Sequence, residues 1–282
     1  MSADEKNELI DRYRENAKRS KYTYSVTARI RQVKQPRGGY IKPKSMSATI
    51  LGEGSENLKQ HGNIHASLIG ITVDYLTRFM LGVPVDEAFK ISFLGASLIG
   101  KEKHAQKLAS NITGLNRRSV LNAIKLCGYD KIYRSGIVGF TPVTSIMPNW
   151  DAMDNVITLV ERSLKFFNDI AGTIVLNGFT LEDGYSEIIG RGDGDYVTED
   201  TLWDLKVSKN MIKKEHTLQL LIYWRMGLRS INRDAFKNVK YLGIFNPYQN
   251  VVYKIPVDDI PDDVIKQVET EVIGYDRVLS AS

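Results

Sequence analysis

The stretch GRGDGDYVTEDTLWDLKVSK, residues 190–209, carries the most information about this chain. Its short runs of β-branched and aromatic residues predict the end of one strand, the turn VTED and a second strand, LWDLKV. Asp195 falls at the end of the first strand, and Asp204 and Lys206 lie two residues apart on the second. Because side chains alternate along a strand, Asp204 and Lys206 share one face. Two neighbouring strands can therefore present two carboxylates and an ammonium to one point.

These side chains suit metal-dependent hydrolysis of a phosphodiester. Carboxylate oxygens are the ligands that a hard cation such as Mg²⁺ or Mn²⁺ prefers. Such a cation polarises the phosphodiester and lowers the pKa of water. A lysine beside it can orient or deprotonate the attacking water. The sequence therefore predicts an active site formed by Asp195, Asp204 and Lys206.

The neighbouring residues make this prediction more specific than the spacing alone, because Asp-x-Lys on an exposed strand is usually an ordinary ion pair. Trp203 and Leu205 alternate with the charged residues and indicate a buried opposite face. Glycines at alternate positions in 190–194 let backbone or substrate come close to Asp195.

Outward from this stretch, the hydrophobic pattern predicts a helical N-terminal half followed by strands and two further helices. Residues 24–34 alternate and favour a strand or an extended arm. Helical period marks these segments: 1–20, 64–82, 85–128, 151–170, 209–228 and 261–275. Strand patterns mark the rest: 173–181, 185–197, 201–208, 241–247 and 250–257. The expected fold is α/β or α+β, a mixed sheet flanked by helices with a helical N-terminal elaboration.

Composition bounds the class of protein. The chain has 282 residues, 43% hydrophobic and 25% charged, as in ordinary soluble proteins. No apolar run approaches the roughly 20 residues that a bilayer requires, and the N-terminus is charged, so we expect a cytoplasmic protein without a membrane partner. The single cysteine, Cys127, excludes an internal disulfide and a four-cysteine iron–sulfur cluster.

The N-terminal segment is strongly basic. Between Arg12 and Lys44 there are eleven Lys or Arg residues and one acid, Glu15. Tyrosines among these cations can stack on unpaired bases. A polyanionic partner such as DNA is one interpretation, and a solvated arm is the other.

The whole pattern resembles the PD-(D/E)XK nuclease superfamily and, within it, the branch of RecB-, AddB- and Cas4-like nucleases. Gln219 and Tyr223, on the helix predicted after the lysine strand, resemble the Gln-x-x-x-Tyr signature of that branch. His65, in GNIHASLIG, resembles its upstream histidine. The resemblance covers roughly residues 60–225. The iron–sulfur cysteines of Cas4-like members and any helicase motifs are absent.

The resemblance implies a restriction-endonuclease-like sheet and a role for each residue. His65, Asp195, Asp204 and the backbone carbonyl of Leu205 would hold Mg²⁺ or Mn²⁺, and Lys206 would position the water.

A second set of residues would bind the substrate. Gln219 and Tyr223 would contact DNA, although the tyrosine also fits the core stripe of its helix. Lys209, Lys213 and Lys214 would line the substrate path or else lie on a solvent-exposed face.

Several alternatives stay open at the site. His61 could replace His65 as the ligand, Asp193 could share the metal with Asp195, and Glu187 could reach the site or be a surface charge. Two further histidines are expected to be solvated: His104 and His216.

The predicted function is hydrolysis of DNA phosphodiester bonds, as an exonuclease or endonuclease on single strands or duplex ends. A non-cleaving nucleic-acid-binding protein is one alternative. Another is a partner-dependent subunit that docks on a helicase or on a phage or plasmid replication-recombination protein. A homo-oligomer would suit an exonuclease that threads an end of the DNA.

The sequence also predicts the domain boundaries. We expect a basic arm and helix over 1–58 and a nuclease domain over 59–282, with a helical insertion at about 84–150 and a catalytic core at about 170–256.

Overall fold

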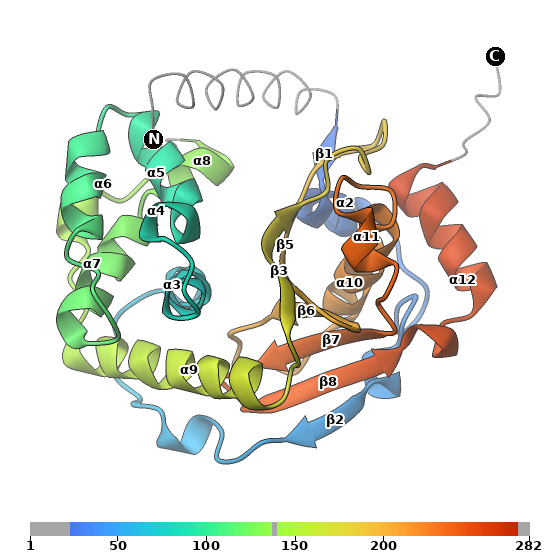
Figure 1. Ribbon diagram of the computed structural model, residues 1–282, viewed down its shortest axis with the longest axis horizontal. Coiled ribbons are helices and arrows are strands. Elements are labelled where there is room, and N and C mark those ends of the chain that lie inside the picture. The colour runs from blue at the N-terminus through green and yellow to red at the C-terminus, as the bar shows by residue number, and fades with distance from the viewer. Residues whose placement is uncertain (1–22, 137–139, 276–282) are drawn as a thin grey trace.

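A six-stranded mixed sheet lies at the centre of the computed structural model, which describes residues 23–136 and 140–275 (Figure 1). Its strand order is β2-β8-β7-β6-β5-β3. The strands are β2 (Ser47–Ile50), β3 (Ile174–Thr180), β5 (Asp193–Thr198), β6 (Thr201–Leu205), β7 (Tyr241–Asn246) and β8 (Val251–Pro256). Helices cover both faces, so the expected mixed sheet flanked by helices is confirmed.

The chain direction within the sheet follows from the connections. β6 and β7 run parallel and all other neighbours run antiparallel. Parallel neighbours need a crossover, which α10 (Lys214–Gly227) and α11 (Arg233–Phe236) provide. Every residue of β6 is buried, because helices pack on both of its faces. The β6 strand that carries Asp204 therefore lies inside the molecule.

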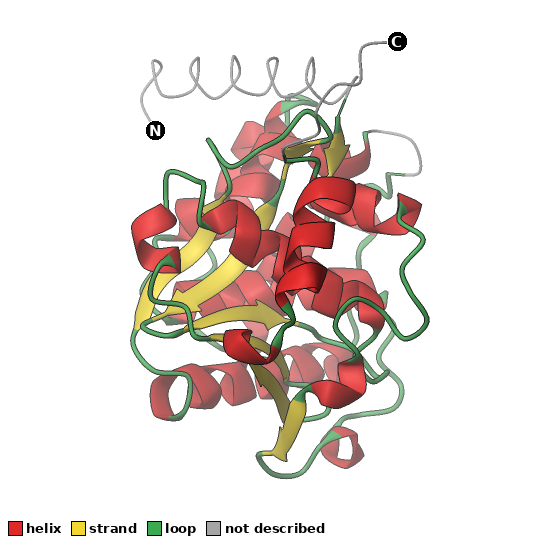
Figure 2. Ribbon diagram, turned by 90° about the vertical axis from the view of Figure 1, so that its right-hand side faces the viewer, coloured by secondary structure: helices red, strands yellow, loops and turns green. Residues whose placement is uncertain are grey.

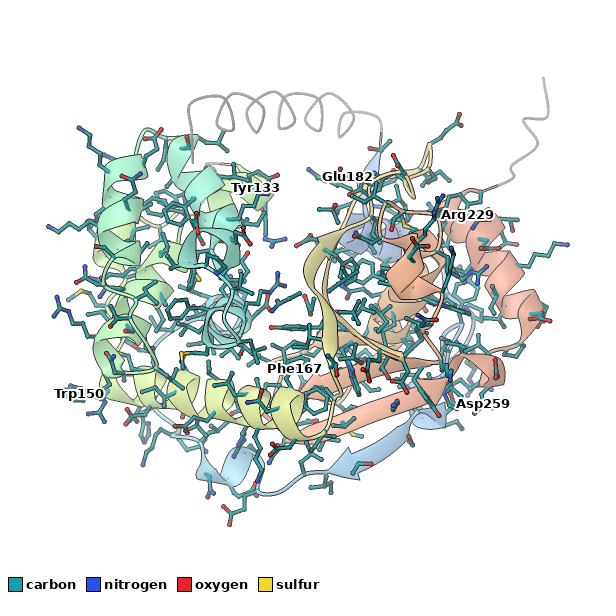
Figure 3. All side chains as sticks on the ribbon, viewed as in Figure 1. Tyr133, Trp150, Phe167, Glu182, Arg229 and Asp259 are labelled. Atoms are coloured by element: carbon teal, nitrogen blue, oxygen red, sulfur yellow. The ribbon has the colours of Figure 1, made fainter. Side chains whose placement is uncertain are left out.

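A helical layer covers one face of the sheet and lies to the left of it in Figure 1. Its helices are α3 (Ala66–Met80), α4 (Val85–Ala88), α5 (Lys90–Ser97), α6 (Glu102–Ala109), α7 (Arg117–Cys127), α8 (Asp130–Ser135) and α9 (Trp150–Asp169), with a 3₁₀ turn at Val143–Ser145. The expected cap at Asn149 is confirmed, because its side chain accepts a hydrogen bond from the Ala152 N–H. In α9, Phe167 lies at the end that meets the sheet and Trp150 at the outer end (Figure 3). The predicted insertion at 84–150 is thus part of a larger unit that includes α3 and α9.

The other face carries a second layer, in front of the strands in Figure 2. Its helices are α2 (Val26–Gln32), α10, α11, α12 (Asp262–Gln267) and the π-helical turn η5 (Val268–Ile273). Leu218, Leu221 and Ile222 of α10 pack here against residues of β5, β6 and β7. A small parallel pair, β1 (Tyr24–Ser25) and β4 (Ile189–Arg191), flanks this layer. The remaining 3₁₀ turns are Pro43–Ser45, Ser55–Asn57 and Val257–Asp259.

The basic segment differs from its prediction. Residues 24–34 form only the two-residue strand β1 and then the helix α2, not a long strand or extended arm. Ser25 caps this helix by accepting the Ala28 N–H at 3.2 Å, and Val26 and Ile30 are buried together one turn apart. Since β2 also joins the sheet beside β8, residues 23–58 belong to the fold and are not a separate arm. The helix predicted over 1–20 lies outside the described residues.

The part of the chain that the structure describes includes no helix with both the length and the apolar character needed to cross a bilayer.

Candidate active site

The site begins where β5 and β6 separate. The two strands pair at Tyr196–Trp203 and Val197–Leu202, and beyond this point they diverge. The carboxylate of Asp195 enters the opening, and its Oδ2 accepts a hydrogen bond of 2.7 Å from the Leu205 N–H. Asp195 is thus held on the backbone of the next strand. What the structure shows for Leu205 is this amide contact, and the metal-ligand role of its carbonyl stays a prediction.

Asp204 and Lys206 form an ion pair at the end of β6. Lys206 Nζ lies 2.9 Å from Oδ1 and 2.7 Å from Oδ2 of Asp204, which confirms that the two side chains share one face. The ammonium has hydrogen-bond geometry only toward Oδ1. Asp204 is 2% exposed, and its Oδ2 has no hydrogen-bond partner among the described residues. The Lys206 ammonium, 2.7 Å from this oxygen, offsets the cost of burying it.

Helix α3 brings two residues that were not predicted, Asp74 and Arg78. The Arg78 guanidinium donates two hydrogen bonds of 3.0 Å to the Asp74 carboxylate, and its Nη2 lies 3.5 Å from Asp195 Oδ1. The Tyr196 hydroxyl donates to Asp74 Oδ1 at 3.3 Å. Arg78 also lies 5.9 Å and 5.6 Å from the ring centres of Tyr75 and Tyr196. The arginine is therefore fixed from several sides next to Asp195.

Gly178 of β3 provides room for this arginine. Its φ of +69° is in the left-handed region, and a Cβ at this position would overlap the Arg78 guanidinium. Glycine meets both conditions without strain. The sequence signal for Asp74 and Arg78 was only an i, i+4 pair of opposite charge, which is most often a solvent-exposed pair on a helix.

The charges of this cluster do not balance. Three carboxylates, Asp74, Asp195 and Asp204, face two cations, Arg78 and Lys206. Burial, reinforced by Asp74 and Asp204, raises the pKa of Asp195 to about 8 against the opposing effect of the two cations. Burial alone would lower the pKa of Lys206, but Asp204 and Asp195 outweigh it and raise that pKa. Lys206 is thus an ammonium ion at neutral pH, which favours orientation of water over removal of its proton.

The donor chemistry fits a hard divalent cation. Carboxylate oxygens and the mutual repulsion of Asp74, Asp195 and Asp204 favour a cation between Asp195 and Asp204. In the structure Lys206 and Arg78 engage these carboxylates. Within residues 23–136 and 140–275 there is no group of three or more His, Cys, Asp or Glu side chains arranged to hold a metal ion.

His65 is not brought into the carboxylate cluster. It is exposed at the N-cap of α3, where its Nδ1 accepts the Ser67 N–H at 3.2 Å and lies 2.7 Å from Ser67 Oγ. It precedes Asp74 by nine residues, which a rise of about 1.5 Å per residue converts to about 13 Å along the helix. The reason is that α3 crosses the site with its C-terminal half and not with its first turn.

The alternative acids have other surroundings. Asp193 is 58% exposed and lies 3.2 Å from Arg134 of α8. The Arg134 guanidinium lowers the pKa of Asp193. Glu187 is exposed, as expected for a surface charge, and lines a pocket beside Tyr185.

The other histidines differ in part from their predictions. His61 is exposed. The expected solvation of His104 and His216 is wrong, because both are partly buried and hydrogen-bonded. Nδ1 of His104 lies 2.7 Å from the Tyr129 hydroxyl, and Nδ1 of His216 accepts the Lys213 N–H at 3.2 Å. Burial, followed by the charge of Lys206, lowers the pKa of His216.

Gln219 and Tyr223 do share one face of α10. Gln219 Nε2 donates to the Tyr223 hydroxyl at 2.9 Å. Burial, followed by the charges of Asp193 and Asp204, raises the pKa of Tyr223 well above its usual value, so this face is turned toward the acids. The two side chains are 9% and 4% exposed, which leaves neither open to a DNA strand in this arrangement. Their contact with DNA stays a prediction.

A cationic surface lies where α10 begins. Thr217 donates to the carbonyl of Ile41 at 2.7 Å, and Gly39, with φ of +96°, lies directly against Lys214. These contacts bring a basic loop of the N-terminal segment next to the first turn of α10. The cationic surface comprises Arg37, Lys42, Lys213 and Lys214. Lys209, four residues before Lys213, is also exposed, and its Nζ lies 5.8 Å from the Tyr248 ring centre.

The fold therefore brings together Asp195, Asp204 and Lys206, as predicted, and adds Asp74 and Arg78 from the helical layer. Comparison of the chain with protein-family models, with curated proteins and with solved structures found no match.

Proposed function

We propose that this chain is a metal-dependent nuclease that hydrolyses DNA phosphodiester bonds, in line with its resemblance to PD-(D/E)XK nucleases. The observation that carries the proposal is the convergence of Asp195, Asp204 and Lys206 from two neighbouring strands, where burial and nearby carboxylates raise the pKa of Asp195 to about 8. Groups with strongly perturbed pKa values concentrate at functional sites. A cytoplasmic location and a helicase or replication-recombination partner are further parts of the proposal.

Each side chain has a role in this reaction. Asp195 and Asp204 would hold Mg²⁺ or Mn²⁺, with Asp74 adding negative charge behind them. The bound cation supplies Lewis-acid stabilisation of the charge that develops on the phosphate. Lys206 would donate hydrogen bonds that orient the attacking water. Arg78, fixed by Asp74, would add positive charge on the opposite side of Asp195.

The cationic surface supports a polyanionic substrate. The described residues contribute no ion-pair partner to Arg37, Lys42, Lys213 or Lys214. Cations without acidic partners are suited to phosphate contacts, whose strength falls as the salt concentration rises. Two of these cations, Lys213 and Lys214, follow Lys206 by seven and eight residues, so a bound strand would be led toward the carboxylates.

The decisive experiment uses end-labelled linear DNA, single-stranded and duplex, and closed circular DNA, each with Mg²⁺, Mn²⁺ or EDTA. We expect cleavage that requires metal and falls at least about 100-fold in Lys206→Met, the range for loss of one charge-stabilising group. Lys237→Met is the matched control, since Lys237 is an exposed lysine paired with Asp234. The proposal fails if no DNA is cut with either metal, or if Lys206→Met cuts as fast as Lys237→Met. Cleavage of the closed circle would identify an endonuclease.

A non-cleaving nucleic-acid-binding protein is the second candidate. It is favoured by the ion pairs that Lys206 and Arg78 already make with Asp204 and Asp195. This candidate predicts DNA binding that needs no metal and decreases with salt. It also predicts that binding survives in Asp204→Ala while no DNA is cut under any metal condition.

A further inference from the structure

A pocket of about 820 Å³ lies beside the candidate active site, in the helical layer. Its walls come from the start of α3, the junction of α7 and α8, and the segment 141–147. Leu68 and Ile71 line it from α3, and the same helix reaches Asp74 three residues later, about 4.5 Å further along its axis. Successive turns of α3 therefore line first the pocket and then the carboxylate cluster.

An ion pair joins the pocket to the catalytic strand. Arg134 lines the pocket, and its Nη2 lies 3.2 Å from Asp193 Oδ2, two residues before Asp195 on β5. The same arginine lies 3.4 Å from the buried Asp130. Asp130 is in turn the acceptor for the Tyr75 hydroxyl at 2.8 Å. Since acids on both sides engage Arg134, this guanidinium is not free to bind a phosphate.

The remaining lining combines apolar walls with hydrogen-bonding groups. The apolar side chains are Ile64, Leu68, Ile71, Ile146 and Met147. The hydroxyl groups come from Ser67, Ser135, Thr141 and Ser145. A pocket of this size and composition suits a flat, largely apolar group that carries hydrogen-bonding edges.

His65 stands at this pocket and not at the carboxylates. Its Nδ1 accepts the Ser67 N–H, so the proton of the neutral imidazole is on Nε2. The Nε2–H is a donor for an acceptor atom on a ligand edge. The residue that resembles the upstream metal histidine thus has the position of a ligand-recognition group.

We propose that this pocket receives an unpaired nucleobase of the strand whose phosphodiester lies at Asp195 and Asp204. The inference rests on the proposed nuclease function and names its substrate class, single-stranded or splayed DNA. A base in a duplex can enter only after it is unpaired and unstacked, which costs free energy. An unstacked base is held in a protein pocket by hydrogen bonds to its edge and by packing between apolar side chains.

The test compares two labelled oligomers of equal length, oligothymidylate and a fully abasic strand, on the Asp204→Asn protein without metal. The readout is fluorescence anisotropy, so cleavage plays no part. We expect the oligomer with bases to bind about tenfold more tightly than the abasic strand, because burial of about 50 to 60 Å² of apolar base surface is worth a factor of about ten. Equal affinity for the two strands overturns the pocket proposal, whereas no binding of either strand overturns the proposed function with it.

Variants of the pocket residues then test whether the preference for bases arises in this pocket. Leu68→Trp fills the pocket and should abolish the preference for bases while abasic binding stays within about twofold. Met147→Trp fills the pocket from its exposed rim. Because Met147 is 67% exposed, this variant keeps the core intact and replaces Leu68→Trp if that protein fails to fold. Ile231→Trp, an exposed position on the other layer, is the control and should keep the preference. A preference that survives both Leu68→Trp and Met147→Trp overturns the assignment to this pocket.

His65→Gln separates base recognition from metal ligation. We expect it to weaken the preference for bases and to leave unchanged the Mg²⁺ concentration that gives half-maximal cleavage. A large rise in that concentration, with an unchanged preference for bases, would return His65 to the metal shell and contradict its role here.

Discussion

Asp195→Asn is expected to stabilise the metal-free protein. The pKa of Asp195 is about 8 in the folded chain and about 3.9 in an unfolded one. The folded state therefore holds this proton more tightly. As pH rises from about 4 to about 8, the unfolded chain releases the proton first, and the free energy of unfolding falls. Above about pH 8 both states are ionised and this contribution stays constant.

The magnitude follows from the size of the shift. A difference of about four pKa units, at about 1.36 kcal/mol each, sets an upper limit of about 5 to 6 kcal/mol above pH 8. Part of this shift comes from repulsion between Asp195 and the carboxylates of Asp74 and Asp204, and neighbouring side chains can move to reduce that repulsion. We expect Asp195→Asn to gain about 2 kcal/mol at pH 8, within the range of single-residue effects. The amide oxygen of asparagine can still accept the Leu205 N–H, so the hydrogen bond need not be lost.

The assay is urea unfolding in EDTA from pH 5 to pH 9. The wild-type protein should lose stability across this range relative to Asp195→Asn, and Mg²⁺ should restore stability only to the wild type. Asp193→Asn is the control on the same strand, because Arg134 lowers the pKa of Asp193 and so shifts it in the opposite direction. This exposed ion pair should contribute under about 1 kcal/mol, and its loss should not stabilise. An Asp195→Asn protein no more stable than wild type at pH 8 refutes the reasoning.

Three further predictions concern packing. Gly178→Ala should cost about 2 kcal/mol and lower cleavage, because φ is +69° and the new Cβ overlaps Arg78; an unchanged melting temperature would contradict this. Tyr223→Phe leaves Gln219 Nε2 without its acceptor and should cost about 1 to 2 kcal/mol in urea unfolding, whereas equal stability would mean that water replaces the hydroxyl. Burial, followed by the charge of Asp130, raises the pKa of the Cys127 thiol, so a disulfide reagent should modify the native protein far more slowly than the urea-unfolded one. Comparable rates for the two forms would show that the thiol is accessible.

Local pattern was sufficient for most of the secondary structure. The run from Ala66 to Met80 and the Asn149 cap were both predictable, because amphipathic period and capping are properties of neighbouring residues. Residues 24–34 were not, since their pattern fits both an alternating strand and an i, i+4 helix. Burial of Val26 and Ile30 against the α10 layer decides in favour of the helix.

Some features of the candidate active site were likewise predictable from local sequence, and others depend on the assembled sheet. Strand alternation alone placed Asp204 and Lys206 on one face, and the ion pair between them agrees. The partner of Asp195 depends on where β5 and β6 stop pairing, which is a property of the sheet and not of either strand.

The sequence by itself determined the two strands that carry Asp195, Asp204 and Lys206, and the buried face on which Trp203 and Leu205 alternate with the charged residues. It also determined the basic character of the N-terminal segment. These features depend only on neighbours within a few residues. Only the tertiary structure decided that Asp74 and Arg78 complete the cluster. Their helix lies more than a hundred residues before β5, and its packing on the sheet sets which side chains meet Asp195. The same packing turned His65 away from the carboxylates and raised the pKa of Asp195, since burial and charge proximity exist only once the layers have assembled.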